Sequence, residues 1–314
     1  MAQQSAAAEA VPVTTPATGA RDKWFRRTLF IPPLGFLVLM TIFPLLYSLG
    51  VSLFNYSLGG TAKFAGFSNY VTLFRDPSFW QVTFITIRIA LFAVAIEMVL
   101  GVLLGFALHQ KLPGMGLFLL IIFLPMMLAP LVVGLFWRFL LDQTFGLVDY
   151  LIASVGFKPI PWLTHPRYAL LSVIIVDVWQ WTPFVVLLTL AGLGTVPPDL
   201  EEAAELDRAS VWMRFKHIYW PHLRFPLLLA LTFRLIDTLK LFDTPFILTG
   251  GGPGNLTTTL SLLGYRFHFQ FFQISTAAAI SWVIVIIINI VANILVPQMQ
   301  KAPRGSEEAV DTGL

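Results

Sequence analysis

Six long apolar runs, separated by shorter polar segments, dominate the pattern of this chain. An α-helix rises ~1.5 Å per residue, so about 20 apolar residues are needed to cross ~30 Å of hydrocarbon. Runs of this kind cover residues 28–53, 82–108, 116–139, 168–194, 225–247 and 273–297. The pattern therefore predicts an all-α membrane protein with six transmembrane helices and with both chain ends on the same side.

The distribution of basic residues predicts the orientation. Eleven Lys and Arg residues lie on the side of the two chain ends, and six lie on the opposite side. Because cytoplasmic segments of membrane proteins carry the excess of Lys and Arg, we expect both ends in the cytoplasm. The segment 197–224 then faces the cytoplasm, and the loops around 55–81, 140–167 and 248–272 face outward.

The two ends of the chain are interpreted as tails. Residues 1–27 begin with a stretch rich in Ala, Thr, Pro and Gln, and they lack the basic start and apolar run of a cleaved signal peptide. We expect a disordered cytoplasmic N-terminal tail there. Residues 298–314 form a cytoplasmic C-terminal tail, and 28–297 form the membrane domain between them.

Composition supports a membrane protein and excludes several kinds of chemistry. Hydrophobic residues make up 57% of the chain and charged residues 12%, against about 25% charged residues in a typical soluble domain. The absence of Cys excludes disulfides, thiol catalysis and Cys-based metal sites. The net charge of +3 follows from the basic cytoplasmic segments and gives no indication of nucleic-acid binding. The five His residues are scattered, so we predict neither a metal site nor catalytic residues.

The polar segment between the fourth and fifth runs has an ordered pattern. Pro197 and Pro198 end the fourth run, and Asp199 is predicted to N-cap a short helix. Residues 207–210 are predicted to form a turn, and residues 211–219 to form a second helix that ends at Pro221. Periodicity alone also permits an amphipathic helix lying on the bilayer surface.

The order of residues in this segment resembles the EAA loop of ABC importer permeases. The matching positions are Glu202, Ala203, Ala204, Asp207, Ala209, Phe215, Ile218, Pro221, Leu223 and Pro226. One position departs from the motif, because Arg208 stands where the family usually has Gly. Gly tolerates a positive φ, so Arg208 implies either a strained turn or a different one.

Other stretches resemble the carbohydrate-importer branch of these permeases, the maltose and glycerol-phosphate permease type. They are Gly66–Tyr70, Asp76–Trp80, Trp179–Phe184, Ala191–Leu193, Phe242–Asp243, Leu248–Gly254 and Thr257–Thr259. The resemblance covers residues 28–297 and implies a type I ABC importer permease fold. It also implies a multi-pass protein of a bacterial or archaeal plasma (inner) membrane.

The resemblance further implies an import system of several subunits. An extracytoplasmic binding protein would deliver a sugar or polyol, two permeases, generally different chains, would form the pathway, and two ATPase subunits would drive transport. The coupling loop at 197–224 would contact an ATPase through Glu202, Ala203, Ala204, Asp207, Arg208, Ala209 and Phe215. This chain lacks the phosphate-binding pattern G-x-x-x-x-G-K-[ST], so it is not expected to be an enzyme. ATP and Mg²⁺ are expected on the partner subunits, with no cofactor bound by this chain.

Charged residues within the apolar runs are candidates for a solute pathway, because a charge at mid-bilayer costs about 2.5–3.5 kcal/mol on insertion scales. Arg234, Asp237, Lys240 and Asp243 alternate in sign at intervals of three, so neighbours can pair along one helix. Such pairing would be structural, whereas Asp237, Lys240 and Asp243 could also bind solute hydroxyls. In the second run, Arg88 and Glu97 are nine residues apart, so each is expected to pair with another helix.

The fourth run contains a second set of pathway candidates near its middle. Asp177, Trp179, Gln180 and Trp181 combine hydroxyl-binding groups with indole faces that suit sugar rings. The alternative is helix–helix packing with Gln180 as a polar contact.

A self-sufficient secondary transporter or channel remains the alternative function. Its support is the set of charges within the apolar runs, which could relay protons. The two halves of the chain share no matching motif, so an inverted-repeat transporter gains no support.

Overall fold

The computed structural model describes residues 20–57, 59–110 and 114–301. The chain divides into two units, one ending at Gly50 and the other beginning at Val51. Most residues of the two predicted tails lie outside the described part of the chain, as do Lys111 and Arg304, two of the eleven basic residues that are expected in the cytoplasm.

The described part of the first unit is the helix α1 (Ala20–Ser52), which runs on into the second unit by two residues. The helix begins within the segment that the sequence suggested as a tail. Its apolar stretch, Arg27–Ser52, matches the first predicted span closely. Three prolines lie inside this helix, at positions 32, 33 and 44.

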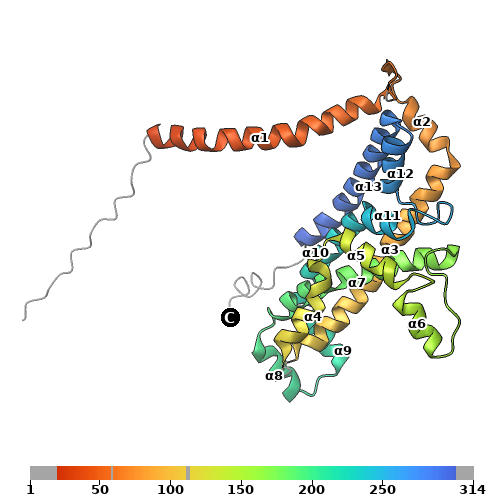
Figure 1. Cartoon of the computed structure of the whole chain (residues 1–314). Coiled ribbons are helices and arrows are strands. Elements are labelled where there is room, and N and C mark those ends of the chain that lie inside the picture. The colour runs from red at the N-terminus through yellow and green to blue at the C-terminus, as the bar shows by residue number, and fades with distance from the viewer. Residues whose placement is uncertain (1–19, 58, 111–113, 302–314) are drawn as a thin grey trace, which may run out of the picture. The chain divides into compact units, whose positions relative to one another are not determined.

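The second unit is a helical bundle with one short antiparallel strand pair (Figure 1). Its elements, in chain order, are β1 (Phe54–Asn55), β2 (Lys63–Phe64), α2 (Ser68–Arg75), α3 (Pro77–His109), α4 (Met115–Met127), α5 (Pro130–Leu140), α6 (Leu147–Ser154), α7 (Pro166–Leu193), α8 (Pro198–Leu206), α9 (Val211–Arg214), the π-helical turn η1 (Phe215–Tyr219), α10 (Trp220–Leu239), α11 (Asp243–Thr249), α12 (Leu260–Tyr265), the π-helical turn η2 (Arg266–Gln270) and α13 (Ile274–Lys301).

The described helices account for most of the predicted spans. Four of them, α1, α3, α7 and α13, are long and apolar enough to cross a membrane, and the bent pair α4–α5 would make a fifth. The predicted span at 225–247 corresponds to α10 and α11, and α10 carries charged side chains along its length. The count of six spans and the cytoplasmic location of both ends therefore stay predictions.

The predicted span at 116–139 is broken in the structure. Helices α4 and α5 meet at an angle of 99°. Ala129 precedes Pro130 and has an extended backbone, because the proline ring disfavours the helical conformation of the residue before it. Pro130 then begins α5, at a position where a missing N–H costs no hydrogen bond.

The fifth predicted span also breaks, after Leu239. Pro245 lies six residues beyond this end, and it has no N–H to donate to the carbonyl of Leu241 in a continuous helix. Instead, the carbonyls of Lys240 and Leu241 accept hydrogen bonds from the hydroxyls of Ser261 (2.9 Å) and Thr259 (2.7 Å). Side chains from a later segment thus satisfy the carbonyl of Lys240, which a continuing helix would have paired with Thr244, and that of Leu241, which Pro245 could not have paired.

Helix α3 packs closely on α7. An added Cβ at Gly101 would lie 2.4 Å from the Cβ of Val185, and one at Gly105 would lie 2.5 Å from the Cγ2 of Thr189. Such closeness requires glycine, as in the small-residue contacts that hold membrane helices together. This contact places the C-terminal third of α3 against the C-terminal third of α7.

Candidate functional site

The segment between α7 and α10 begins with the short helix α8. Its N-cap residue is Pro197, and Pro198 occupies the first turn. The prediction that Asp199 caps this helix is wrong, because the helix starts two residues earlier than predicted, where a proline fits without losing a hydrogen bond. Asp199 and Glu201 instead lie in the first turn, where carboxylates interact favourably with the helix dipole.

Helix α8 ends in a tight turn around Arg208. The N–H of Ala209 donates to the carbonyl of Ala204 (2.9 Å), and the N–H of Arg208 donates to that of Glu205 (3.1 Å). These two bonds form a Schellman motif, whose central residue adopts the left-handed conformation and is usually glycine. Arg208 has a φ of +49°. The turn therefore keeps the geometry that suits glycine, with an arginine in a strained conformation.

The second half of the segment runs into α10 without a loop. Ser210 caps α9 by accepting a hydrogen bond from the N–H of Met213. The prediction that Pro221 ends the second helix is wrong, because the π-helical turn η1 carries the chain directly into α10. In this turn the N–H of Trp220 donates to the carbonyl of Phe215, five residues back. The next residue, Pro221, has no N–H to donate.

Aromatic side chains anchor this segment to α3. The ring of Phe106 lies 5.9 Å from that of Phe215 and 5.2 Å from that of Tyr219, measured between centroids. Burial, together with the Glu201 carboxylate, raises the pKa of Tyr219. At its other end, α8 brings Glu201 to 3.8 Å from His109 of α3. Helix α8 and the turn η1 thus both touch the end of the same long helix.

The outer face of this segment carries large apolar side chains. Trp212 is 71% exposed, and the others are Leu206, Val211 and Met213. Together with the exposed Glu202 and Ala203 they form what we call the docking patch. Exposed apolar groups rimmed by charges mark protein interaction sites. The four apolar residues were missed as site residues, although their position in a polar segment outside the spans was a signal.

The charged residues of the spans meet at Arg234 of α10. Its Nε and Nη2 donate to the two carboxylate oxygens of Glu97 in α3, at 2.7 and 2.9 Å. Its Nη2 also donates to Asp177 of α7 (2.8 Å), and its Nη1 donates to Asp237 (3.0 Å). Arg234, Glu97 and Asp177 are at most 2% exposed. One guanidinium thus joins three helices, and we call these four residues the ion cluster.

The ion cluster reaches the surface at one side. The second carboxylate oxygen of Asp237 lies 3.4 Å from the ammonium of Lys240, and these side chains are 40% and 57% exposed. The expected pairing along one helix is confirmed as far as Lys240, where α10 ends. Asp243 begins α11 instead. Glu97 pairs with another helix as expected, whereas Arg88 is exposed and forms no ion pair within the described residues.

The structure places the other pathway candidates in contacts between helices. Gln180 is buried, and its amide donates to the carbonyl of Leu128 at the break between α4 and α5 (3.2 Å). Trp179 packs edge-on against Trp137 of α5. Trp181 lies under the guanidinium of Arg234, 4.9 Å from the ring centroid. In this conformation Gln180 acts as a polar contact, the packing alternative that the sequence left open.

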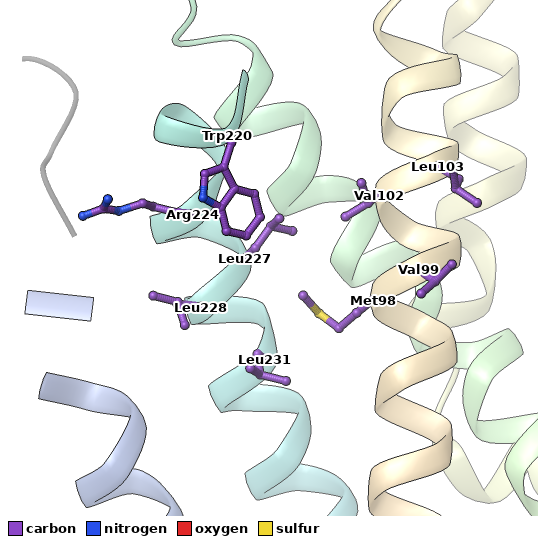
Figure 2. A pocket seen from close by; sticks show the side chains of 9 residues that line it. All are labelled: Met98, Val99, Val102, Leu103, Trp220, Arg224, Leu227, Leu228 and Leu231. Atoms are coloured by element: carbon purple, nitrogen blue, oxygen red, sulfur yellow. The ribbon is translucent and has the colours of Figure 1, made fainter. Parts of the chain in front are cut away.

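An apolar groove of about 660 Å³ lies between α3 and α10 (Figure 2). Its lining consists of Met98, Val99, Val102, Leu103, Trp220, Arg224, Leu227, Leu228 and Leu231. Arg224 is the only charged side chain among these, so the groove offers few partners for sugar hydroxyls. The exposed end of the ion cluster, with Asp237 and Lys240, offers such partners instead.

Comparison with known proteins identifies relatives over most of the chain. Residues 97–301 match the family described as binding-protein-dependent transport system inner membrane component. A probable ABC transporter permease protein of Sinorhizobium fredii is 40% identical, and the match covers 84% of this chain and 85% of the relative. The trehalose/maltose transport system permease protein MalF of Thermococcus litoralis is 34% identical, and the match covers 76% of this chain and 82% of that protein.

A solved structure agrees with the fold. A chain of a bacterial ABC transporter involved in the import of the acidic polysaccharide alginate superposes with a TM-score of 0.78. The match covers 90% of this chain and 98% of that chain, at 18% sequence identity. At this identity the likeness supports the permease fold alone. With the family match over residues 97–301 and the relatives above, the chain belongs to the binding-protein-dependent transport system inner membrane components and is the permease subunit of an ABC importer.

Proposed function

We propose that this chain forms, with a second and different permease chain, the pathway for a carbohydrate or polyol across a bacterial or archaeal plasma membrane. An importer of this family works with a partner permease, an ATPase and a solute-binding protein in general. In our proposal two ATPase subunits bind all of the ATP and Mg²⁺, and this chain catalyses no reaction. The proposal takes the carbohydrate class from the name of the MalF relative and from the motifs of the sugar-importer branch.

The observation that carries the coupling role is the docking patch on α8 and α9. The patch combines small and acidic residues on α8 with exposed apolar side chains beyond the turn. Behind it, Phe215 and Tyr219 pack on Phe106 of α3, and η1 joins the segment to α10. A movement of an ATPase subunit bound to the patch would therefore reach two spans directly. We assign coupling to Glu202, Ala203, Ala204, Asp207, Arg208, Ala209 and Phe215, together with Leu206, Val211, Trp212 and Met213 of the patch.

The solute role is proposed for the exposed end of the ion cluster. Asp237 offers a hydrogen-bond acceptor and Lys240 offers donors, and both side chains are partly exposed. Asp243, which begins the next helix, completes this set. Asp177 and Trp181 contact Arg234 behind this pair, whereas Trp179 and Gln180 pack at α5 and at the α4–α5 break in this conformation. Sugar hydroxyls both donate and accept hydrogen bonds, so a paired acceptor and donor suits them.

Coupling is tested by replacing Ala203 with Glu in the complete importer. Ala203 is exposed, so the change alters the docking patch without disturbing a core. We expect sugar uptake to fall about tenfold or more, as when a charge is placed at the centre of a protein interface, with normal membrane insertion. The matched control is Ala62→Glu, which changes an exposed alanine between β1 and β2 and should leave uptake unchanged.

Two results would contradict the proposal. Normal uptake by the Ala203→Glu importer would remove the coupling role of the docking patch. Ion-driven uptake by the purified chain alone in liposomes would favour the self-sufficient transporter. Isolation from native membranes in mild detergent should instead recover an ATPase and a second permease with this chain.

A further inference from the structure

The ion cluster needs an explanation beyond holding helices together. Carboxylates and a guanidinium removed from water lose solvation that their mutual attraction only partly replaces, and apolar side chains of similar size often stabilise a fold as well or better. Here Glu97, Asp177 and Arg234 are all buried between spans. Charged groups at such a position are more readily explained by a function at the place where the cluster reaches the surface.

The contacts of Arg234 fix the position of Asp237. Its Nε and Nη2 are held by Glu97 and Asp177, and the Nη2 also contacts the hydroxyl of Thr238 (3.0 Å). The remaining nitrogen, Nη1, donates to one oxygen of Asp237. Because a guanidinium is planar and rigid, anchoring two of its nitrogens determines the direction of the third. Only the other oxygen of Asp237 is left to face Lys240.

We propose that Arg234 is a positioning residue for the solute site. Held by Glu97 and Asp177, it orients Asp237 so that Asp237 and Lys240 present an acceptor and a donor at a fixed spacing to a sugar. This inference rests on the proposed function, because it assumes that Asp237 and Lys240 contact the solute. Glu97 and Asp177 would then affect how firmly the solute is held, although neither side chain reaches the surface.

The test measures sugar transported per ATP hydrolysed by the complete importer in proteoliposomes, with saturating loaded binding protein. Trehalose is the probe, with maltose, lactose and sorbitol in parallel. This ratio does not depend on how much complex assembles, so a merely structural role would leave it unchanged. A solute held loosely escapes during the cycle, so loss of a charge-assisted contact should lower the ratio by about tenfold.

The variants form a double-mutant cycle between the buried anchor and the exposed acid. We expect Asp237→Asn and Lys240→Met to lower the ratio about tenfold, and Glu97→Gln to lower it several-fold without touching the solute. The double variant Glu97→Gln/Asp237→Asn should be no worse than Asp237→Asn alone, because the anchor acts through that residue. Lys63→Met removes an exposed lysine of the β1–β2 hairpin and serves as the matched control.

A milder variant keeps the test decisive if Glu97→Gln does not assemble. Thr238→Val removes one neutral contact of Arg234 and leaves every charge in place, and it should lower the ratio by a smaller factor. If both Glu97→Gln and Thr238→Val keep the wild-type ratio, the positioning role is overturned and the solute site stays intact. Where Glu97→Gln does not assemble, a wild-type ratio for Thr238→Val alone has the same consequence. Unchanged ratios for Asp237→Asn and Lys240→Met would overturn the solute site itself. Failure of the wild-type importer to transport any of the four probes would overturn the carbohydrate proposal and this inference with it.

Discussion

The close contact between α3 and α7 predicts that Gly101→Ala destabilises the protein. A Cβ at this position would lie 2.4 and 2.5 Å from the Cβ and Cγ1 of Val185 and 3.3 Å from its carbonyl carbon. Carbon atoms in ordinary contact are about 3.5–4.0 Å apart. The two helices must therefore separate by about 1 Å, because the nearest atoms belong to a stiff β-branched side chain close to its own backbone.

The expected magnitude follows from two opposing effects. Overpacking a well-filled contact costs about 1–3 kcal/mol. Replacing glycine with alanine inside a helix contributes about 0.5–1 kcal/mol in the opposite direction. The free energy of unfolding should therefore fall by about 1–2 kcal/mol, and it should fall further for Gly101→Leu. Val185 lies eight residues beyond Asp177 on α7, so the separation also strains the contact between Asp177 and Arg234.

The measurement is thermal unfolding of the purified complex in detergent, followed by tryptophan fluorescence. The matched control is Gly116→Ala in α4, where an added Cβ meets no atom within 4 Å. We expect Gly116→Ala to unfold at or above the wild-type temperature and Gly101→Ala to unfold below it. Equal unfolding temperatures for the two variants would refute the argument from close packing.

Three further predictions concern the turn, the ion cluster and the helix break. Arg208→Gly should stabilise the α8–α9 turn by about 1 kcal/mol, because glycine adopts the left-handed conformation without strain. The change should appear as slower proteolysis of this loop, and faster cleavage would contradict it. Arg234→Met should lower the free energy of unfolding by about 3–5 kcal/mol by leaving two buried carboxylates without their cation. Replacing Glu97, Asp177 and Arg234 together with apolar residues should restore most of that loss in the unfolding assay. Gln180→Leu should cost about 1–3 kcal/mol, because the carbonyl of Leu128 loses its donor, and an unchanged unfolding temperature would show that this bond contributes nothing.

Hydropathy predicted where the long helices lie but not where they break. The apolar run 116–139 contains Pro125 and Pro130, and these prolines were a usable signal for the break between α4 and α5. Pro245 was a comparable signal for a break in the fifth run, but it lies six residues beyond the end of α10. The position of that end also depends on hydroxyls of Thr259 and Ser261, some twenty residues further along the chain, and a local pattern cannot predict such bonds.

For the site residues too, contacts between neighbours in the sequence could be predicted, and contacts between distant helices could not. A motif indicated the α8–α9 segment, and the departure at Arg208 left two alternatives, of which the structure has the strained turn. The charges of the spans were visible in the sequence, but their partners were not. Pairing at intervals of three accounts for Asp237 and Lys240, whereas Glu97 and Asp177 meet Arg234 only because three helices cross at one point.

Arg234 divides α10 into a long part before it and a short part after it. From Trp220, where the helix begins, to Arg234 is about 21 Å, and from Arg234 to Asp237 is about 4.5 Å, at 1.5 Å per residue. If α10 tilts about the ion cluster, a displacement of about 3 Å at Trp220 moves Asp237 by only about 0.6 Å. The helix would thus act as a reducing lever. Large movements of the ATPase would displace Asp237 and Lys240 only slightly. A sugar bound there would then stay in place while the rest of the permease moves around it.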